Sequence, residues 1–197
     1  PMAGWTLGIP DEEFEQRKPR RGLITKAEVR VVSLAKLCLR PDSIVWDIGP
    51  GSGSVAIEAA RIACRGRVYA IEKNPEAYRF LLRNIERNRV SEIVDPHLGD
   101  CREVAGAIGP VADRVLMGYL HNTISFLPHA LGMLSSAGGI VHIHSLVVRG
   151  KEGELAAEAT STAEELGYRA KLLGQRVIKS YSPSKLHIAL DIFALKH

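Results

Sequence analysis

The chain has few cysteines and no long apolar run. Its 197 residues include three cysteines, Cys38, Cys64 and Cys101, whose spacing matches neither a disulfide framework nor a zinc site. No stretch has the length and apolarity of a membrane span, and no signal peptide or low-complexity tract is found. These absences predict a cytoplasmic protein in a reducing compartment, with no membrane partner and no bound metal.

What remains is the composition of an ordinary globular domain. Hydrophobic residues make up 46% of the chain and charged residues 24%. The net charge is +4 and the isoelectric point is about 9.1, which permits an anionic partner without demanding one. No internal repeat or linker divides the chain. We therefore expect residues 1–24 to form an N-terminal extension and residues 25–197 to form one domain.

The most informative stretch is a predicted strand, turn and helix over residues 44–60. Residues 44–48 are apolar and largely β-branched, as a buried parallel strand requires. Gly49, Gly51 and Gly53 follow, and their missing side chains let the backbone turn sharply and let a ligand lie against it. The next helix points its free N–H groups toward the same space. Such a unit is typical of a nucleotide-like cofactor site.

The spacing of the glycines and the next acidic residue indicate which cofactor is bound. The pattern is neither Gly-x-Gly-x-x-Gly nor a phosphate loop, because no Gly-Lys-Ser/Thr follows. The second predicted strand, residues 67–71, ends at Glu72, whose carboxylate can accept hydrogen bonds from both ribose hydroxyls. Asp47 can order the loop or meet a cationic amino group. This pair predicts S-adenosylmethionine; the alternative is a tight turn followed by an unrelated acidic residue.

Two further positions extend the predicted cofactor site. Thr25 and Glu28 match a capping box, which would begin a helix at Thr25 and place it near the cofactor's edge. Asp100 follows the third strand, where it can accept a hydrogen bond from an adenine amino group, cap the helix beginning at Cys101, or do both. The predicted cofactor-binding residues are Thr25, Asp47, Gly49, Pro50, Gly51, Gly53, Glu72, Lys73 and Asp100.

Apolar periodicity predicts an α/β fold with a Rossmann-like sheet of seven strands. The predicted strands span 44–48, 67–71, 93–97, 113–117, 140–145, 170–178 and 186–195, and helices separate the first five. The first helix is expected to run to about Arg40, where Pro41 would end it. Residues 179–185 form a polar turn, and strands joined by a short turn must be antiparallel. The sheet is therefore mostly parallel with a C-terminal antiparallel hairpin.

The loop after the fourth strand, residues 118–122, is expected to face the ligand crevice and the acceptor. Tyr119 and His121 in this loop, together with His144, are candidates for orienting the acceptor or accepting a proton. The alternative is that they simply line the crevice. His142 and His144 share one face of a strand, but no acidic or cysteine partner for a metal is evident.

The first 24 residues show no clear periodicity. Residues 8–14 are compatible with a turn and a short helical piece, followed by the basic cluster Arg17-Lys18-Pro19-Arg20-Arg21. Two interpretations stand side by side: a solvated lead-in, or a functional segment that is either a flap over the substrate or an anion-binding arm.

The first half of the chain resembles known methyltransferases. Residues 46–53 followed by residues 69–75 resemble the class I S-adenosylmethionine-dependent methyltransferases, whose sheet has seven strands and a final hairpin. Residues 8–14 and 22–30 resemble, more closely, the decarboxylating C15 methyltransferase of the cobalamin pathway, a precorrin enzyme. This resemblance implies methyl transfer to a tetrapyrrole ring carbon with loss of an acetate carboxyl group, usually in a homotetramer.

The second half resembles a different group. Residues 117–122, 126–128, 139–144 and 179–183 are similar to the archaeal wybutosine-pathway transferases. That resemblance implies a tRNA guanosine derivative as acceptor, and in some members transfer of an aminocarboxypropyl group instead of methyl. We expect a corrinoid precursor first and a tRNA base second. A third hypothesis, motivated by the basic cluster, is a non-catalytic module that binds the cofactor and RNA.

Overall fold

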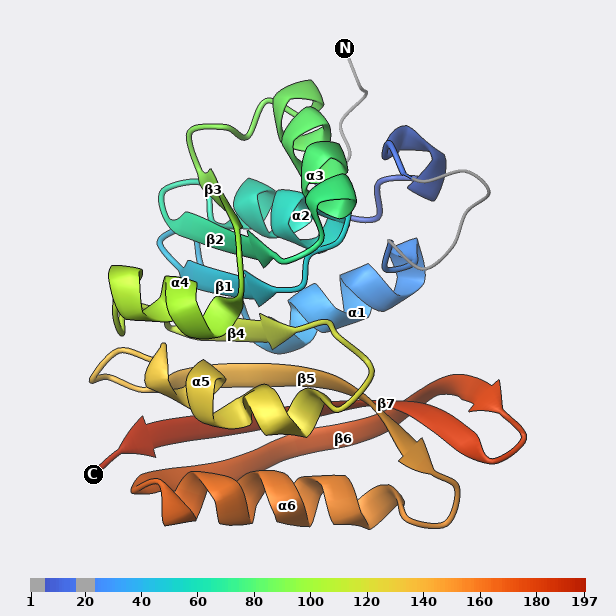
Figure 1. Cartoon of the computed structure of the whole chain (residues 1–197), viewed down its shortest axis with the longest axis vertical. Helices are drawn as coiled ribbons and strands as arrows, with labels where there is room; N and C mark the ends of the chain where they lie inside the picture. Colours follow the sequence, from blue (N-terminus) through green and yellow to red (C-terminus); the bar gives the residue numbers. More distant parts are fainter. Residues whose placement is uncertain (1–5, 17–23) are drawn as a thin grey trace. The chain divides into compact units, whose positions relative to one another are not determined.

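A computed structural model describes residues 6–16 and 24–197 of the protein. Its seven strands have the order β3-β2-β1-β4-β5-β7-β6, and the last two pairings are antiparallel (Figure 1). This confirms the predicted α/β sheet with a C-terminal antiparallel hairpin. The chain divides into two compact units, one ending at Val104 and the other beginning at Ala105. In the described ranges, no helix combines the length and apolarity needed to cross a membrane.

The first unit holds the glycine loop. Its elements are η1 (Asp11–Glu13), α1 (Ala27–Leu37), β1 (Ile44–Ile48), α2 (Ser54–Ile62), β2 (Arg67–Glu72), α3 (Pro75–Arg87), β3 (Val94–Leu98) and the start of α4 (Cys101–Ile108). β1, β2 and β3 are parallel, and Ile48, Ile71 and His97 lie side by side in register. The carboxyl ends of these strands therefore share one edge, as the prediction of a cofactor site requires.

Helix α1 does not begin as the capping box predicted. It starts at Ala27, and its N-cap residue, Lys26, makes no side-chain capping bond. The Ala27 N–H donates instead to Asp11 Oδ1 at 3.1 Å. A carboxylate from η1 therefore caps the helix in place of the Thr25 side chain. The other end also differs, because Cys38 has φ 48° and its left-handed conformation stops the helix before Pro41.

Residues 8–16, which we call the N-terminal strap, are not a solvated lead-in. Ile9 and Phe14 are buried. The backbone N–H groups of Gly8 and Ile9 donate to the two carboxylate oxygens of Glu58 at 3.1 and 3.0 Å. That interpretation is therefore wrong for this segment. The basic cluster at residues 17–21 lies outside the described residues.

The second unit carries the rest of α4 and the antiparallel hairpin. Its other elements are β4 (Arg114–Met117), η2 (Thr123–Phe126), α5 (Leu127–Gly132), β5 (Gly139–Val148), α6 (Glu152–Glu165), β6 (Tyr168–Ser182) and β7 (Lys185–Lys196). β4 is parallel to β5, β7 is antiparallel to β5, and α6 packs against β6. Apolar residues of β5 and β7, among them Ile143 and Ile188, form the core of this unit.

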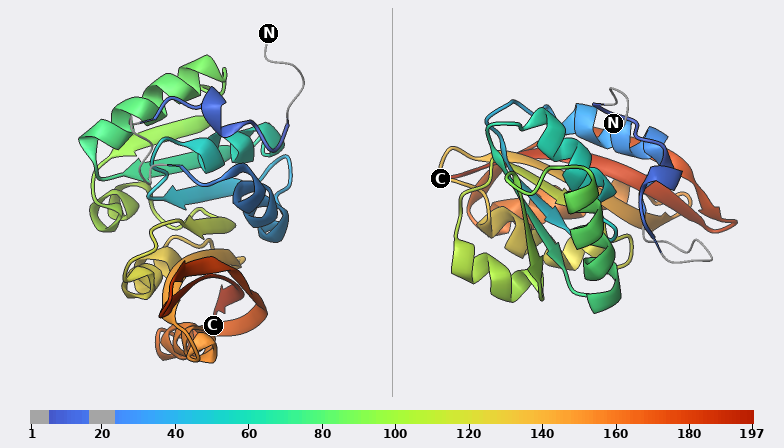
Figure 2. Two further views of the ribbon diagram at one scale, coloured as in Figure 1. Left: turned by 90° about the vertical axis from the view of Figure 1, so that its right-hand side faces the viewer. Right: turned by 90° about the horizontal axis from the view of Figure 1, so that it is seen from above.

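The hairpin is longer than predicted. Residues 179–182 were expected in the turn, but they belong to β6, and residues 183–184 connect it to β7. Three register shifts interrupt the β6–β7 pairing. Bulges of this kind increase twist and let long strands curve, which Figure 2 shows for these two strands. Tyr181 is consequently a strand residue near the end of β6.

Candidate active site

The loop between β1 and α2 adopts a conformation that suits glycine. Gly49, Gly51 and Gly53 all have positive φ angles, of 75°, 60° and 86°. At Gly53, an added Cβ would lie 2.4 Å from Cδ1 of Leu81, a fully buried side chain of α3. The carbonyl of Pro50 accepts the Gly53 N–H at 2.9 Å and closes the turn. The loop therefore presents bare backbone at the end of β1.

Glu72, at the end of β2, is hydrogen-bonded to this loop. Its Oε2 accepts the Gly51 N–H at 2.9 Å, and its Oε1 accepts the Asn74 N–H at 2.7 Å. A carboxylate offers about four acceptor positions, and these two bonds use half of them. Glu72 thus stabilises the loop and keeps acceptor capacity for hydroxyl groups of a ligand.

Asp47, just before the loop, is almost completely buried, with 1% of its surface exposed. Burial, and after it the charge of Glu72, raises the pKa of Asp47 to about 7, against a smaller opposing effect of the Ala56 N–H. Its Oδ2 atom has no hydrogen-bond partner among the described residues. A buried carboxylate with an unused oxygen suits a cationic ligand group, because the cation would stabilise its ionised form.

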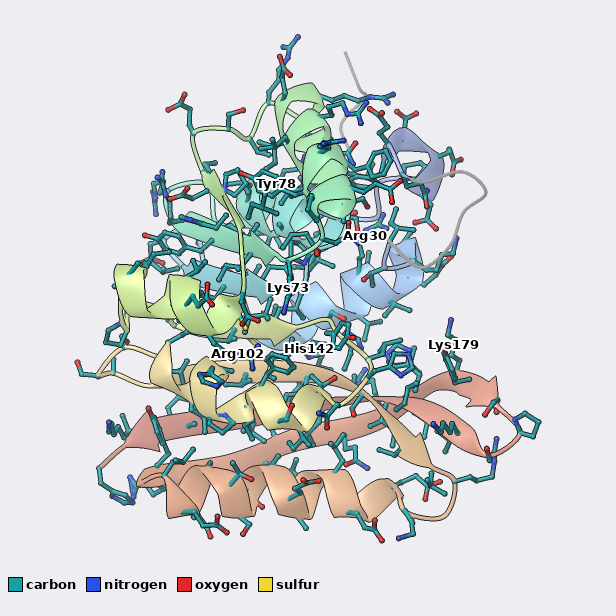
Figure 3. All side chains as sticks on the ribbon, viewed as in Figure 1. Arg30, Lys73, Tyr78, Arg102, His142 and Lys179 are labelled. Atoms are coloured by element: carbon teal, nitrogen blue, oxygen red, sulfur yellow. The ribbon has the colours of Figure 1, made fainter. Side chains whose placement is uncertain are left out.

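Asp100 lies after β3 and already has several partners. Its Oδ1 accepts the Arg102 N–H at 3.0 Å, which confirms the predicted capping of α4. Its Oδ2 also contacts the Arg102 guanidinium at 2.6 Å and Lys73 Nζ at 3.0 Å. Figure 3 labels these two cations. The hydrogen bonds from Arg102, and secondarily from Lys73, hold the pKa of Asp100 well below its usual range.

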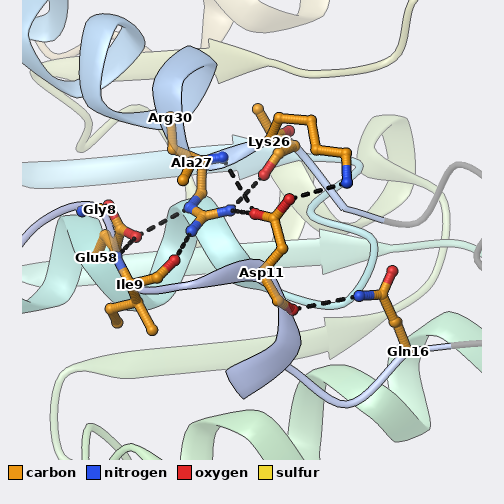
Figure 4. A network of polar contacts seen from close by, with 9 residues as sticks. Gly8, Ile9, Asp11, Gln16, Lys26, Ala27, Arg30 and Glu58 are labelled. Atoms are coloured by element: carbon orange, nitrogen blue, oxygen red, sulfur yellow. Dashed lines mark hydrogen bonds and ion pairs between the residues drawn. The ribbon is translucent and has the colours of Figure 1, made fainter.

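Thr25 belongs to a different polar network, which Figure 4 shows. Its carbonyl accepts a hydrogen bond from Arg30, as does the carbonyl of Ile9. Arg30 is fully buried and also pairs with Glu58 at 2.9 Å and with Asp11 at 2.8 Å. The structure therefore places Thr25 in the attachment of the N-terminal strap, and its contact with a cofactor stays a prediction.

Sequence reasoning missed Asn84, which links the strap to the glycine loop. This fully buried side chain of α3 accepts the Glu15 N–H at 2.8 Å and donates to the Glu15 carbonyl at 2.9 Å. It also donates to the carbonyl of Ser52, within the loop, at 2.9 Å. The one signal in the sequence was a polar residue beside the apolar stripe of Leu81 and Ile85.

In the second unit, two of the predicted acceptor residues lie in an aromatic cluster. Ring centroids are 6.4 Å apart for Tyr119 and His121, 6.4 Å for Tyr119 and Phe126, and 6.2 Å for His121 and Tyr181. Tyr119 is 55% exposed and Tyr181 is 49% exposed. The loop is held to β5 by a hydrogen bond from the Leu146 N–H to the Leu120 carbonyl at 3.1 Å. These four rings form a solvent-facing surface that suits a planar ligand.

His144 is not in this cluster. It is buried on β5 in what we call the histidine chain: Asp191, His142, His144 and His187. The sequence pattern revealed no acidic partner for a metal at these histidines and gave no sign of Asp191 of β7, which lies opposite His142 and contacts it at 2.5 Å. Within residues 6–16 and 24–197, no group of three or more His, Cys, Asp or Glu side chains could hold a metal ion.

Taken together, a glycine loop between a parallel strand and a helix, acidic residues at the strand ends and the observed strand order define a class I S-adenosylmethionine-dependent methyltransferase fold. The chain belongs to the TRM5/TYW2 methyltransferase domain family, which matches residues 26–170.

Two relatives reproduce both resemblances predicted from the sequence. The tRNA(Phe) (4-demethylwyosine(37)-C(7)) aminocarboxypropyltransferase of Pyrococcus horikoshii is 34% identical over 87% of this chain, which spans 59% of that relative's length. The probable cobalt-precorrin-6B C(15)-methyltransferase (decarboxylating) of Sulfolobus acidocaldarius is 33% identical over 90% of this chain and 88% of its own length. The predicted family resemblances are therefore confirmed.

A solved structure supports the cofactor prediction. TYW2 of Methanocaldococcus jannaschii in complex with AdoMet superposes with a TM-score of 0.76 at 34% identity, covering 86% of this chain and 75% of that one. S-adenosylmethionine is thus the ligand of a family member with the same fold, which confirms the predicted class of cofactor.

Proposed function

We propose that this chain is an S-adenosylmethionine-dependent transferase that binds its cofactor in the first unit. The observation that carries the proposal is the buried, unpartnered Oδ2 of Asp47 beside a glycine loop already hydrogen-bonded to Glu72. Glu72 would accept the ribose hydroxyls, Asp47 would face the ammonium group, and Asp100 would accept from the adenine amino group. The cofactor supplies an electrophilic carbon on a sulfonium whose sulfur leaves as a neutral thioether.

The chain's own residues then have to bind and align the acceptor. Because the sulfonium is intrinsically reactive, placing the acceptor atom at the right distance and angle supplies most of the needed acceleration. The exposed rings of Tyr119 and Tyr181 offer stacking surfaces for a planar acceptor, and His121 stands between them. We propose that Tyr119 and His121 orient the acceptor.

Calorimetry with S-adenosylhomocysteine tests the cofactor site. Glu72→Ala should weaken binding by about 1–3 kcal/mol, because a ribose would lose its hydrogen-bonded carboxylate. Glu86→Ala is the matched control, since Glu86 is an exposed acid on α3. Unchanged affinity in Glu72→Ala would remove the ribose role from Glu72, and no binding by the unaltered protein would refute the site as a whole.

For the acceptor we propose a corrinoid precursor that is methylated with loss of a carboxyl group. The supporting observation is the N-terminal strap. Residues 8–14 carry much of the resemblance to the precorrin enzymes, and the strap is built into the first unit by Glu58 and Asn84. It also lies outside residues 26–170, the part shared with the TRM5/TYW2 domains. Because the strap is built into the fold, its resemblance supports the corrinoid acceptor more strongly than the resemblance of a loosely attached tail would.

A tRNA guanosine derivative is the second candidate. The segments that resemble the wybutosine-pathway transferases supply the aromatic cluster, including Tyr119 and Tyr181. Exposed aromatic rings can stack on an unpaired base, and Lys179 and Lys185 on the hairpin could meet phosphates. This candidate differs from the first in what is transferred as well as in the acceptor.

Labelled cofactor distinguishes the two candidates. The protein is incubated with a precorrin mixture and, separately, with total archaeal tRNA, using S-adenosylmethionine labelled in the methyl group or in the aminocarboxypropyl group. Methyl label entering tetrapyrroles, together with released carbon dioxide, is the expected result. Label of either kind entering tRNA while tetrapyrroles stay unlabelled would overturn the order of the candidates.

The predicted homo-oligomer remains a prediction. Leu172, Leu173 and Val177 on β6 are each about half exposed, which is consistent with burial against a second copy. Light scattering on the purified protein tests it: a monomer at micromolar concentration would contradict the prediction.

A further inference from the structure

The histidine chain is a continuous line of hydrogen bonds within the second unit. Asp191 Oδ1 lies 2.5 Å from His142 Nδ1, His142 Nε2 lies 3.1 Å from His144 Nε2, and His144 Nδ1 lies 2.8 Å from His187 Nε2. All four side chains are buried. His142 is labelled in Figure 3. They come from β5 and β7, whose antiparallel register brings them to one face of the sheet.

These contacts determine where each proton sits. With Asp191 ionised, His142 must donate from Nδ1, which leaves its Nε2 as an acceptor. His144 must then donate from Nε2 and accept at Nδ1, so that His187 donates from Nε2. The last atom of the chain, His187 Nδ1, is therefore a bare lone pair. Among the described residues it has no hydrogen-bond partner.

His187, the last residue of the histidine chain, is paired with the strand that is hydrogen-bonded to the predicted acceptor loop. His187 is paired with Leu146 of β5, and the Leu146 N–H donates to the carbonyl of Leu120. On the other side, His187 is paired with Lys179, two residues before Tyr181 of the aromatic cluster. The unpartnered nitrogen is thus at the same end of the hairpin as the rings proposed to hold the acceptor.

We propose that Asp191, His142, His144 and His187 form a proton relay that exchanges one proton with the acceptor through His187 Nδ1. The role in transfer rests on the proposed function, whereas the proton positions in the relay do not. The sequence pattern indicated only that His142 and His144 share one face of a strand, and it linked neither of them to His187 or Asp191.

Adding one proton at His187 reverses the two hydrogen bonds between histidines, while His142 still donates to Asp191. His187 passes its Nε2 proton to His144 Nδ1, and His144 passes its own Nε2 proton to His142 Nε2. The positive charge then rests on His142, against the carboxylate of Asp191. His144 and His187 stay neutral, but each now carries its proton on Nδ1, so the unpartnered nitrogen of His187 becomes a donor.

Burial and neighbouring groups disfavour a positive charge on His144 and on His187. Burial, and then the neighbouring His142 and His187, lower the pKa of His144 well below its ordinary value. Burial, Lys179 and His142 lower the pKa of His187 to about 4. Lys179 on β6 and Asp191 on β7 are the charged groups beside the relay in these contacts. A proton entering at His187 is therefore driven toward the end that holds Asp191.

The charged relay fits the proposed decarboxylation. When the bond between the acceptor's methylene carbon and its carboxylate breaks, carbon dioxide leaves and the electron pair stays on that carbon. A proton from His187 Nδ1 completes the methyl group, and the relay returns to its uncharged form. Solvent protons recharge it before the next turnover.

Nitrogen-15 NMR of histidine-labelled protein tests the relay without cofactor or acceptor. At pH 8 we expect protons on Nδ1 of His142, Nε2 of His144 and Nε2 of His187. As the pH falls, the relay should take up one proton, and His144 and His187 should both switch to the Nδ1–H form at the same midpoint. A neutral His187 with its proton on Nδ1 at pH 8, or no proton uptake by the relay down to pH 4, would overturn the proposal.

Variants separate a relay from ordinary packing. His144→Leu should interrupt the relay, so that His187 no longer switches to its Nδ1–H form. Ser145→Ala, which alters a buried neighbour on β5, should retain the switch. In single-turnover assays with the precorrin mixture, His187→Gln should be slower by about 100-fold with S-adenosylhomocysteine affinity unchanged. A switch that persists in His144→Leu, or full turnover in a folded His187→Gln protein, contradicts the relay. If the unaltered protein does not bind S-adenosylhomocysteine, the proposed function is contradicted, whereas the proton positions in the relay are not.

Discussion

If Asp47 faces the ammonium group of the cofactor, the affinity for S-adenosylhomocysteine should depend on pH. A ligand that lacks the ammonium group should not show this dependence. The pKa of Asp47 is raised to about 7 in the folded protein without ligand. Below that pH the carboxyl is mostly protonated and has to lose its proton before it can pair with a cation. Binding of S-adenosylhomocysteine should then release a proton, and its affinity should rise with pH until about pH 7.

The size of the effect follows from the same value. Each pH unit below 7 leaves about tenfold less ionised Asp47, so affinity at pH 5 should be about 100-fold lower than at pH 8. This corresponds to about 2.7 kcal/mol. The ammonium group stays charged over this range, and the pKa of Asp100 lies far below it, so neither group produces the same dependence.

Calorimetry in buffers of different ionisation enthalpy measures both affinity and proton release. The matched ligand is 5′-methylthioadenosine, which lacks the amino acid tail and should bind with little dependence on pH. The matched variants are Asp47→Asn, which should remove the dependence, and Asp42→Asn, an exposed acid before β1, which should retain it. Equal pH profiles for the two ligands, or an unchanged profile in Asp47→Asn, would refute the pairing.

The same residue makes a prediction for the protein without ligand. Because the folded pKa of Asp47, about 7, is raised above its ordinary 3.8, its contribution to stability is complete below pH 4 and is lost as the pH rises through 7. The loss should reach roughly 4 kcal/mol. Urea denaturation should find Asp47→Asn more stable than the unaltered protein at pH 8 and nearly equal to it at pH 4.

Two further substitutions test the framework around the site. Gly53→Ala would push a methyl group to 2.4 Å from Leu81 at a positive φ, so we expect a loss of about 2–4 kcal/mol in urea denaturation and weaker S-adenosylhomocysteine binding; Gly153→Ala, on an open face of α6, should lose nothing. Arg30→Met would leave the carboxylate of Glu58 buried without its cation, and should cost about 3–5 kcal/mol. In that case, adding Glu58→Leu should recover part of the loss, and a deeper loss in the double variant would contradict the explanation.

Local patterns in the sequence were sufficient where structure depends on neighbours in the chain. The glycine loop, the strand that ends at Glu72 and the cap at Asp100 all lie within a few residues of their determinants. The helix start predicted at Thr25 was wrong because Asp11, from another segment, accepts the hydrogen bond of the Ala27 N–H. Asp191 was missed for the same kind of reason, because its contact with His142 depends on the register between β5 and β7.

The N-terminal strap shows a further limit. Its burial depends on two separated apolar residues, Ile9 and Phe14, and on backbone groups bonded to Glu58, none of which produces a periodic pattern. Strand residues 179–182 were placed in a turn because their polar composition resembles one. Their inclusion in β6 depends on pairing with β7, which composition does not report.

The single amide of Asn84 has a thermodynamic consequence. It is hydrogen-bonded to the strap at Glu15 and to the glycine loop at Ser52, so movement of either segment changes what the other can bond. Two such segments share a coupling free energy, and that coupling is reciprocal. If a ligand ordered the loop, it would tighten the hold on the strap by the same amount as a docked strap favours the ligand. Ligand binding at the glycine loop could then be measured as slower hydrogen exchange of the Glu15 amide, although the strap need not touch the ligand.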